Sequence, residues 1–254
     1  MFTPQGPTLR ELAAQALSST ERGYDLLAPK FDRTPFRTPD SILDATVSAL
    51  RPMGPFGSGL DVCCGTGAGT TALRRLCTGQ VTGVDFSTGM LTVARSALHD
   101  APGTGGSPAV HWVRADARRL PFAPVFDLAV SFGAFGHFLP AEQPRLFAAV
   151  HASLRPGGLF AFPVPAPPRV GSAAYWALLG FDTAMRVRNA LWRPPFVMYY
   201  RTFRLPRVLE NLAATGFTTS TVPLTALGRR RDGSPACRLV LARRPSVERN
   251  TLSV

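Results

Sequence analysis

The central part of the sequence alternates short apolar runs with helical patterns, and this alternation leaves few folds open to the chain. Five runs are typical of strands: "SGLDVCC", "QVTGVDF", "VHWVR", "FDLAVSF" and "LFAFPV". Helical patterns lie between them, namely "GTTALRRLC", "STGMLTVARSALH", for which Ser87 is a candidate N-cap, and "AEQPRLFAAVHASL". Strands that alternate with helices predict a parallel, doubly wound α/β sheet.

The segments outside this alternation predict a single domain with a lid. A helix, "LPRVLENLAATG", and two strands, "FTTSTVPLTAL" and "CRLVLARR", close the chain, and "APGTGGSPA" is typical of a flexible loop. We expect one domain over residues 1–254, with a helical N-terminal lid (1–57), a ligand-binding core (58–164), a substrate lid (165–204), and a closing helix and β-hairpin (205–254).

The composition favours a cytoplasmic protein with reduced thiols. The first residues lack the basic start and apolar run of a secretory signal, and no apolar run reaches the roughly 18 residues that span a bilayer. The chain has four cysteines without C-x-x-C spacing: Cys63, Cys64, Cys77 and Cys237. We therefore expect neither disulfides nor a metal site.

The net charge of +12 is carried almost entirely by arginine, because Lys30 is the one lysine. Nucleic-acid binders usually mix lysine and arginine in runs, whereas these arginines are scattered. The pattern favours a compositional bias and argues against a nucleic-acid partner, and an anionic partner remains the alternative.

Three glycines, Gly65, Gly67 and Gly69, directly follow the first predicted strand in "GLDVCCGTGAGT". Glycines at this place allow a tight turn and a close approach of the backbone to a ligand. The dinucleotide pattern G-x-G-x-x-G, counted from Gly65, would need glycine where Thr70 stands. We interpret the segment as a cofactor turn in which Cys63 is a small turn residue without a redox or metal role.

Aspartates stand at or beside the ends of three successive predicted strands. Asp85 can accept hydrogen bonds from both hydroxyls of a ribose, Asp116 can accept one from an adenine amino group, and Asp61 can face a ligand ammonium. Three carboxylates suit a ligand with a ribose, an adenine and a cation, and they suit a pyrophosphate poorly because phosphates would be repelled.

The segments "LDVCCGTGAGT", "VTGVDFSTGML", "RADARRLPF" and "LRPGG" resemble the successive motifs of class I S-adenosylmethionine-dependent methyltransferases over about residues 20–165. The variant "DVCCGTG", together with "YDLLAPKFD" at Tyr24–Asp32, is similar to the C-methyltransferases of menaquinone and ubiquinone biosynthesis. The resemblance implies a Rossmann-like seven-stranded sheet of order 3-2-1-4-5-7-6. It also implies that S-adenosylmethionine contacts Asp61, Cys63, Gly65, Gly67, Asp85, Phe86, Met90, Asp116, Ala117 and Ser131.

The resemblance further implies in-line attack of a substrate nucleophile on the sulfonium methyl group, which needs positioning more than catalytic side chains. His137 follows the fourth predicted strand and could accept a proton from the nucleophile. Tyr24 could cover the methyl end of the cofactor. Its structural alternative is helix packing, and that of His137 is a structural hydrogen bond.

Residues 165–204 are rich in aromatic side chains, which predicts an apolar substrate pocket. We expect Trp176, Phe196 and Tyr199 in its wall. In this fold the loop "GRRRDGSP" between the last two strands emerges at the cofactor edge. Arg229 and Arg231 could then meet an anionic group of the substrate or of an acidic carrier protein, and the alternative is a solvated hairpin tip.

The sequence thus predicts metal-independent methyl transfer to a small, largely apolar metabolite, aromatic or polyketide-like and with an optional anionic group. It departs from the quinone enzymes at "GAFGHF" and "PVPAPPRVG", so a quinone ring is an alternative substrate. Methylation of RNA or protein is a second alternative, and a non-catalytic cofactor-binding regulator is a third.

Overall fold

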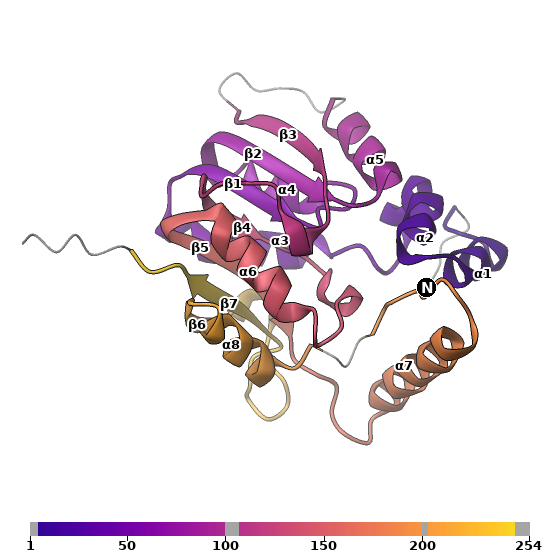
Figure 1. The fold of residues 1–254 in the computed structure, drawn as a ribbon. Helices are drawn as coiled ribbons and strands as arrows, with labels where there is room; N and C mark the ends of the chain where they lie inside the picture. The colour runs from indigo at the N-terminus through magenta and orange to yellow at the C-terminus, as the bar shows by residue number, and fades with distance from the viewer. Residues whose placement is uncertain (1–4, 100–106, 200–202, 247–254) are drawn as a thin grey trace, which may run out of the picture.

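The computed structural model describes residues 5–99, 107–199 and 203–246 (Figure 1). Most of the predicted loop at 101–109 lies outside the described residues. No helix in the described ranges is long and apolar enough to cross a membrane.

A seven-stranded sheet of order β3-β2-β1-β4-β5-β7-β6 forms the centre of the molecule, which confirms the predicted fold (Figure 1). The first five strands pair in parallel, and β7 runs antiparallel between β5 and β6. The strands are β1 (Phe56–Val62), β2 (Cys77–Asp85), β3 (Ala109–Arg114), β4 (Phe126–Val130), β5 (Leu154–Pro165), β6 (Thr218–Pro223) and β7 (Cys237–Arg243).

Helices cover both faces of the sheet. Leu146 and Phe147 of α6 (Gln143–Ser153) and Leu212 of α8 (Leu205–Ala214) enter one buried apolar cluster. The other face packs against α3 (Asp40–Leu50) and α4 (Ala68–Leu73), and α5 (Thr88–His99) contacts β2 and β3. Short 3-10 helices are η1 (Ala28–Arg33), η2 (Arg51–Met53), η3 (Ala117–Arg119), η4 (Phe135–His137) and η5 (Thr225–Leu227).

Local hydrogen bonds explain where the central elements begin and end. The Ser87 hydroxyl accepts a hydrogen bond from the Met90 N–H at 3.1 Å, so Ser87 caps α5 as predicted. Strand β1 ends at Val62 because Cys63 adopts a φ of 60°, which breaks the extended backbone. Strand β2 begins at Cys77, three residues earlier than predicted, because Cys77 pairs with Phe56 of β1.

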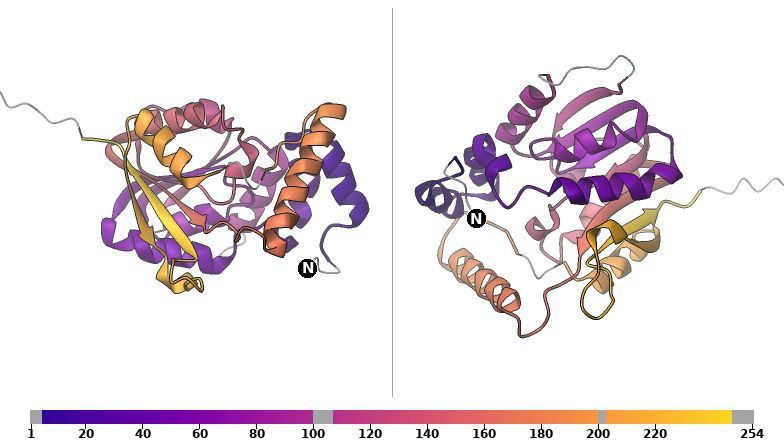
Figure 2. Two further views of the ribbon diagram at one scale, coloured as in Figure 1. Left: turned by 90° about the horizontal axis from the view of Figure 1, so that it is seen from below. Right: turned by 180° about the vertical axis from the view of Figure 1, so that it is seen from behind.

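Two segments far apart in the sequence lie side by side beyond the C-terminal ends of the parallel strands (Figure 2). They are α1 (Leu9–Leu17) with α2 (Thr20–Leu27), and α7 (Ala173–Leu191) with the chain after it. Arg188 donates a hydrogen bond to the Ser18 carbonyl at 3.2 Å, and the Val197 N–H donates one to the Thr20 hydroxyl at 3.0 Å. Between the segments lies a small apolar cluster of Met185, Phe196, Met198 and Tyr199.

The leucines of α6 and α7 offer a matched test of this arrangement. Leu146 is fully buried against the sheet, whereas Leu191 of α7 is 79% exposed. We expect Leu146→Ala to lower the free energy of unfolding by about 2–5 kcal/mol, because it leaves a cavity in the core. Leu191→Ala should change it by less than about 0.5 kcal/mol. Urea denaturation of both variants measures the difference, and equal losses would contradict the packing described.

Candidate active site

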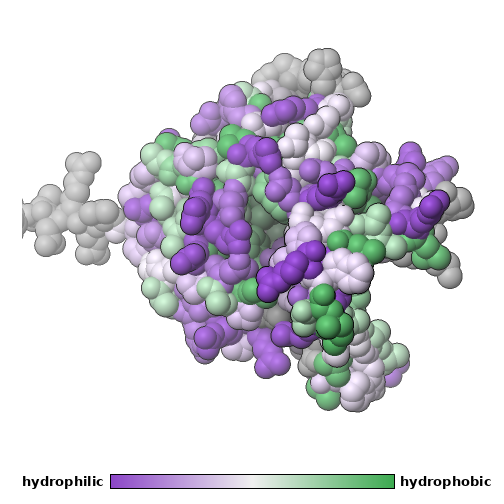
Figure 3. Space-filling model, turned by 45° about the vertical axis from the view of Figure 1, so that its right-hand side comes forward, coloured by the Kyte–Doolittle hydropathy of each residue, from purple (hydrophilic) through white to green (hydrophobic). Residues whose placement is uncertain are grey.

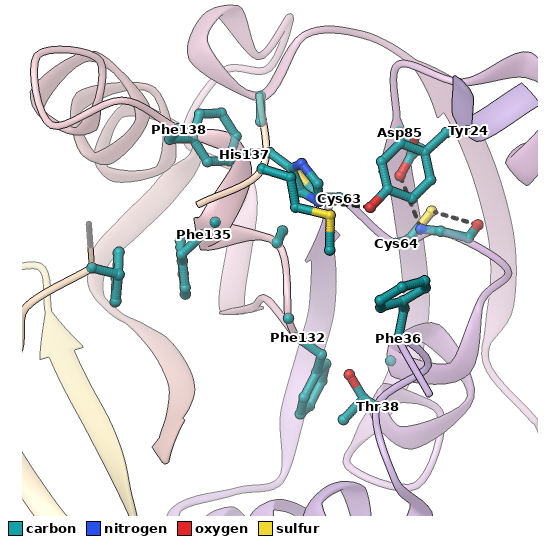
Figure 4. Close-up of a pocket in the computed structure, with 18 of the residues that line it drawn as sticks. Tyr24, Phe36, Thr38, Cys63, Cys64, Asp85, Phe132, Phe135, His137 and Phe138 are labelled. Carbon is teal, nitrogen blue, oxygen red and sulfur yellow. Dashed lines mark hydrogen bonds between the residues drawn. The ribbon is translucent and has the colours of Figure 1, made fainter. Parts of the chain in front are cut away.

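A cavity of about 1100 Å³ opens at the C-terminal edge of the sheet, between the strand ends and the two packed segments. The space-filling view shows the molecule hollowed in this region (Figure 3). One part of the cavity is lined by the turn after β1 and by the ends of β2 and β3, and the other by aromatic and proline side chains. Figure 4 shows ten of the lining residues with labels.

The glycine turn after β1 is built for close approach to a ligand. Cys63 has a φ of 60° and Gly65 a φ of 54°, both in the left-handed region that favours glycine. A Cβ placed on Gly65 would meet no atom within 4 Å, because this residue faces the open cavity. On Gly69 a Cβ would lie 2.7 Å from the Asp61 carboxylate, so only glycine lets α4 sit this close to β1.

Asp61 brings a buried carboxyl group to the cavity wall. Its Oδ2 accepts a hydrogen bond from the Thr70 hydroxyl at 2.9 Å, while Oδ1 is buried without a hydrogen-bond partner among the described residues. Burial, and secondly the neighbouring charge of Asp85, raise the pKa of Asp61 to about 7. A cationic group in the cavity would satisfy the open oxygen and favour the charged form.

Asp85 stands at the end of β2 and joins two turns to each other. One carboxylate oxygen accepts the Gly65 N–H and the other accepts the Ser87 N–H, each at 2.9 Å. Burial raises the pKa of Asp85, and these backbone hydrogen bonds oppose that effect. Each oxygen keeps a further lone pair that can accept a hydrogen bond from a ligand hydroxyl.

Asp116 lines the cavity but is already engaged in an ion pair. Its carboxylate caps η3 and takes hydrogen bonds from the Arg118 side chain, which also pairs with Glu142. The hydrogen bond from Arg118 lowers the pKa of Asp116, so the group is charged at neutral pH. Sequence reasoning missed Arg118 and Glu142, because the pairing joins η3 to the start of α6. Both residues also line the cavity.

The N-terminal motif "YDLLAPKFD" holds α2 and η1 against this site. Asp25 accepts hydrogen bonds from the Ser87 hydroxyl at 2.6 Å and from the Gly89 N–H at 2.8 Å, at the start of α5. Asp32 accepts one from the Thr66 hydroxyl, within the glycine turn, at 2.6 Å. The sequence analysis assigned no role to either aspartate. Their position near the two ends of the motif was the feature that could have indicated one.

Tyr24 and His137 point toward each other in the wall of the cavity (Figure 4). The Tyr24 hydroxyl lies 2.7 Å from His137 Nε2, and His137 Nδ1 lies 2.7 Å from the Val197 carbonyl. A carbonyl can only accept, so Nδ1 carries the proton and Nε2 accepts from Tyr24. Burial lowers the pKa of His137, which keeps the imidazole neutral.

The part of the cavity beyond this pair is apolar. It receives side chains from the segment after β4, from the end of β5, from the N-terminal segment before β1, and from α7 with the chain after it. Its lining includes Phe36, Ile42, Phe132, Phe135, Phe138, Pro163, Pro165, Pro167, Leu178, Pro195, Met198 and Phe203.

The structure brings most of the predicted cofactor residues to one cavity wall. Its lining contains Asp61, Cys63, Gly65, Asp85, Phe86, Met90, Asp116 and Ala117. Gly67 is not part of the cavity lining and is the N-cap residue of α4. Ser131 is buried, and its hydroxyl donates a hydrogen bond to the Val62 carbonyl at 2.8 Å, so it joins β4 to β1.

The predicted substrate residues do not line the cavity. Trp176 is 58% exposed on α7. Phe196 packs on Tyr24 and under Gly23, and Tyr199 accepts a hydrogen bond from Asn189. Phe196 therefore joins the α7 segment to α2, Tyr199 holds the chain after α7 against that helix, and other side chains of the region form the cavity wall.

The loop between β6 and β7 emerges at the expected edge, because Pro223 pairs with Arg238 and Pro165 with Cys237. However, Arg229 and Arg231 are outside the cavity lining. Arg229 donates to the Gly233 carbonyl at 2.9 Å, within its own hairpin, which explains why it does not reach the cavity.

The thiols and carboxylates of the described residues include no group arranged to hold a metal ion. All four cysteines are free, and burial raises the pKa of both Cys63 and Cys64. Protonated thiols are poor nucleophiles and poor metal ligands.

Comparisons with known proteins agree with this geometry. Residues 60–158 match the family model described as "Methyltransferase domain". The demethylmenaquinone methyltransferase of Staphylococcus aureus is 38% identical over 104 residues, which cover 39% of each chain. The alignment therefore spans about two fifths of the length of this curated relative.

Two solved structures share the fold. A SAM-dependent methyltransferase from Methanosarcina mazei covers 76% of this chain, with 94% of its own length, a TM-score of 0.56 and 20% identity. The DhpI–SAH complex covers 94% of this chain, with 99% of its own length, a TM-score of 0.61 and 18% identity. Residues 60–158 thus match a methyltransferase domain, and the chain shares its fold with solved S-adenosylmethionine-dependent methyltransferases.

Proposed function

We propose that this protein transfers a methyl group from S-adenosylmethionine to a small, largely apolar metabolite. The observation that carries the proposal is the cavity in which three strand-end carboxylates and the glycine turn meet an apolar, aromatic compartment. The match of residues 60–158 to a methyltransferase domain supports the reaction class.

The polar wall fits this cofactor in charge and in shape. Asp61 Oδ1, which has no hydrogen-bond partner among the described residues, could pair with the ammonium of the methionine part. The remaining lone pairs of the Asp85 oxygens could accept hydrogen bonds from the ribose hydroxyls. Gly65 leaves room for the ligand beside the turn. Ala117 and Asp116 would border the adenine, with Arg118 holding the Asp116 carboxylate in place. The bound sulfonium would supply an electrophilic methyl group.

The lid segments would exclude water from the reacting groups. Asp25 and Asp32 tie α2 and η1 to the start of α5 and to the glycine turn. Cofactor binding at that turn and closure of the N-terminal segment would therefore stabilise each other. In-line transfer depends mainly on such positioning in a dry site.

The Tyr24–His137 pair could move a proton during transfer. His137 holds its proton at Nδ1, so Nε2 is ready to take the proton of the Tyr24 hydroxyl. The Tyr24 oxygen could then accept a proton from a phenol, an enol or an activated carbon acid. The pair lies in the wall between the polar and apolar compartments, where the two reactants would meet.

Quinone-ring C-methylation is the second candidate, because the identity to the demethylmenaquinone methyltransferase of Staphylococcus aureus favours it. That identity covers 39% of this chain. A direct test adds labelled S-adenosylmethionine and a panel of phenols, enols, hydroquinones and transfer RNA, and follows where the label goes. Transfer to RNA alone would overturn the proposed substrate class, and no transfer to any acceptor would favour a non-catalytic regulator.

Replacing Asp85 tests the cofactor site. We expect Asp85→Ala to weaken S-adenosylmethionine binding by about 1–3 kcal/mol, because ribose hydroxyls lose their acceptor. Asp127→Ala is the matched control, since Asp127 also holds a backbone N–H, that of Ser58, at the opposite edge of the sheet. Calorimetry measures both affinities. Equal binding by wild type and Asp85→Ala, or tighter binding of NAD, would refute the assignment.

The raised pKa of Asp61 predicts a pH-dependent affinity. Below about pH 7 the buried carboxyl is protonated, so it cannot pair with the ligand ammonium. Affinity for S-adenosylmethionine should therefore rise as pH increases from about 5 to 7, before an α-amino group begins to lose its proton near pH 8. Asp61→Asn should flatten this rise in titrations across that range. A variant that keeps the wild-type slope would assign the titration to another group.

The tyrosine–histidine pair predicts matched, non-additive effects on turnover. With an accepted substrate, Tyr24→Phe and His137→Ala should each lower kcat by about 10²–10⁴-fold, because either change breaks one proton path. The double variant should be no slower than the worse single variant. Cofactor affinity should stay nearly constant. Additive losses, or turnover that none of the changes affects, would show that the two residues act only through packing.

A further inference from the structure

The outward side of α7 is an uncharged helix face in contact with solvent. The buried residues Asp182 and Met185 mark the inward side of α7, and Leu178 on that side lines the cavity. At 100° per residue, the opposite side presents Ala173, Trp176, Ala177, Gly180, Thr183, Ala184, Val187 and Leu191. We call these residues the outer face. Trp176, Val187 and Leu191 are exposed by 58%, 54% and 79%.

A solvated helix normally carries charged residues on such a face. The two arginines of α7 lie elsewhere and are held by the protein. Arg186 stacks on the Tyr199 ring, with its guanidinium carbon 4.9 Å from the ring centroid. Arg188 donates hydrogen bonds to the Pro194 and Ser18 carbonyls. The lobe formed by α7 accordingly shows mostly white and green atoms in Figure 3.

Exposed basic and aromatic side chains flank the two ends of the outer face. Arg169 and the 84% exposed Val170 precede α7, and the 53% exposed Trp192 and exposed Arg193 follow it. Residues 165–199 contain four arginines and a single acidic residue, the buried Asp182. Apolar side chains bordered by arginine and tryptophan match the chemistry of a lipid surface with anionic headgroups.

We propose that the outer face of α7 docks this protein onto an anionic lipid surface, with α7 lying in the plane of the interface. Val187, Leu191 and the two tryptophans would enter the headgroup boundary, while Arg169 and Arg193 pair with lipid phosphates.

Charge decides between a lipid surface and a second copy of this chain as the occupant. A symmetric dimer through the outer face would bring Arg169 and Arg193 of two copies together, in a protein of net charge +12. An anionic bilayer instead attracts both of these arginines, which lie beside the outer face.

Docking of α7 on a lipid surface would also affect the cavity, because α7 and the segment before it contribute to its wall. Leu178 on the inward side of α7 and the prolines from Pro165 to Pro168 line it. The docked helix would therefore hold one wall of the cavity beside the lipid. The docking itself does not depend on the proposed methyl transfer.

Co-sedimentation of the full chain with vesicles tests the proposal. We expect binding to vesicles of phosphatidylglycerol mixed with phosphatidylcholine, and much weaker binding to phosphatidylcholine alone. Val187→Glu/Leu191→Glu should lower the partition coefficient by about tenfold or more, because two apolar anchors are lost. Met53→Glu/Val125→Glu is the matched control, since these residues are 38% and 36% exposed and precede β1 and β4 at the opposite edge of the sheet.

Two further measurements distinguish docking on a lipid surface from self-association of the chain. Arg169→Glu/Arg193→Glu should remove the preference for phosphatidylglycerol, whereas Arg51→Glu/Arg243→Glu should reduce it far less. Bromine-labelled lipids should quench the tryptophan fluorescence of the wild type and quench the Trp176→Phe/Trp192→Phe variant much less. Equal partitioning of wild type and Val187→Glu/Leu191→Glu would overturn the proposal. So would a concentration-dependent dimer, seen by sedimentation velocity and broken by that variant, without vesicle binding.

Discussion

The hydrogen bonds of one carboxylate, that of Asp85, hold together the region on which the rest of the site depends. Its two oxygens bind the Gly65 and Ser87 N–H groups, so the turn after β1 and the turn after β2 share one anchor. The left-handed backbone at Cys63 and Gly65 is also tied to β2 by the Cys64 N–H, which donates a hydrogen bond to the Val84 carbonyl at 2.9 Å. Parallel pairing of β1 with β2 brings the three groups together, because it places both C-terminal ends at one edge. Burial makes the arrangement costly for a charge, and the backbone N–H groups offset part of that cost.

The N-terminal segment, α2 with η1, is held by the same region. Asp25 binds the start of α5, directly after the turn that Asp85 holds, and Asp32 binds Thr66 of the glycine turn. The N-terminal segment is thus attached to the polar half of the cavity, and through Phe196 and Arg188 it is attached to the insertion. A change at the polar wall would therefore reach the apolar compartment through direct contacts. This coupling is a reason to treat the polar half of the cavity, the N-terminal segment and the α7 segment as one unit in any functional proposal.

Electrostatics divide the cavity into two halves with different chemistry. Asp61 and Asp85 are buried carboxyls with raised pKa values, and Asp116 stays charged because Arg118 pairs with it. On the other side, His137 is kept neutral by burial and accepts from Tyr24. A cationic ligand would stabilise the first half, and an apolar nucleophile suits the second. The reaction class that we propose needs this pairing of environments within one enclosure.

The sequence alone determined the order of strands and helices, the glycine turn and the strand-end aspartates, because periodicity and spacing are local properties of the chain. The resemblance to class I methyltransferases also predicted the strand order correctly. Only the tertiary structure decided which distant side chains meet. It paired Tyr24 with His137 and Arg118 with Glu142, and it placed Phe196 between α2 and the chain after α7. It also kept Arg229 within its own hairpin and left the apolar face of α7 uncovered by the described chain. The reason is physical: a strand end fixes where the backbone stands, whereas packing between segments far apart in the sequence fixes where a side chain points.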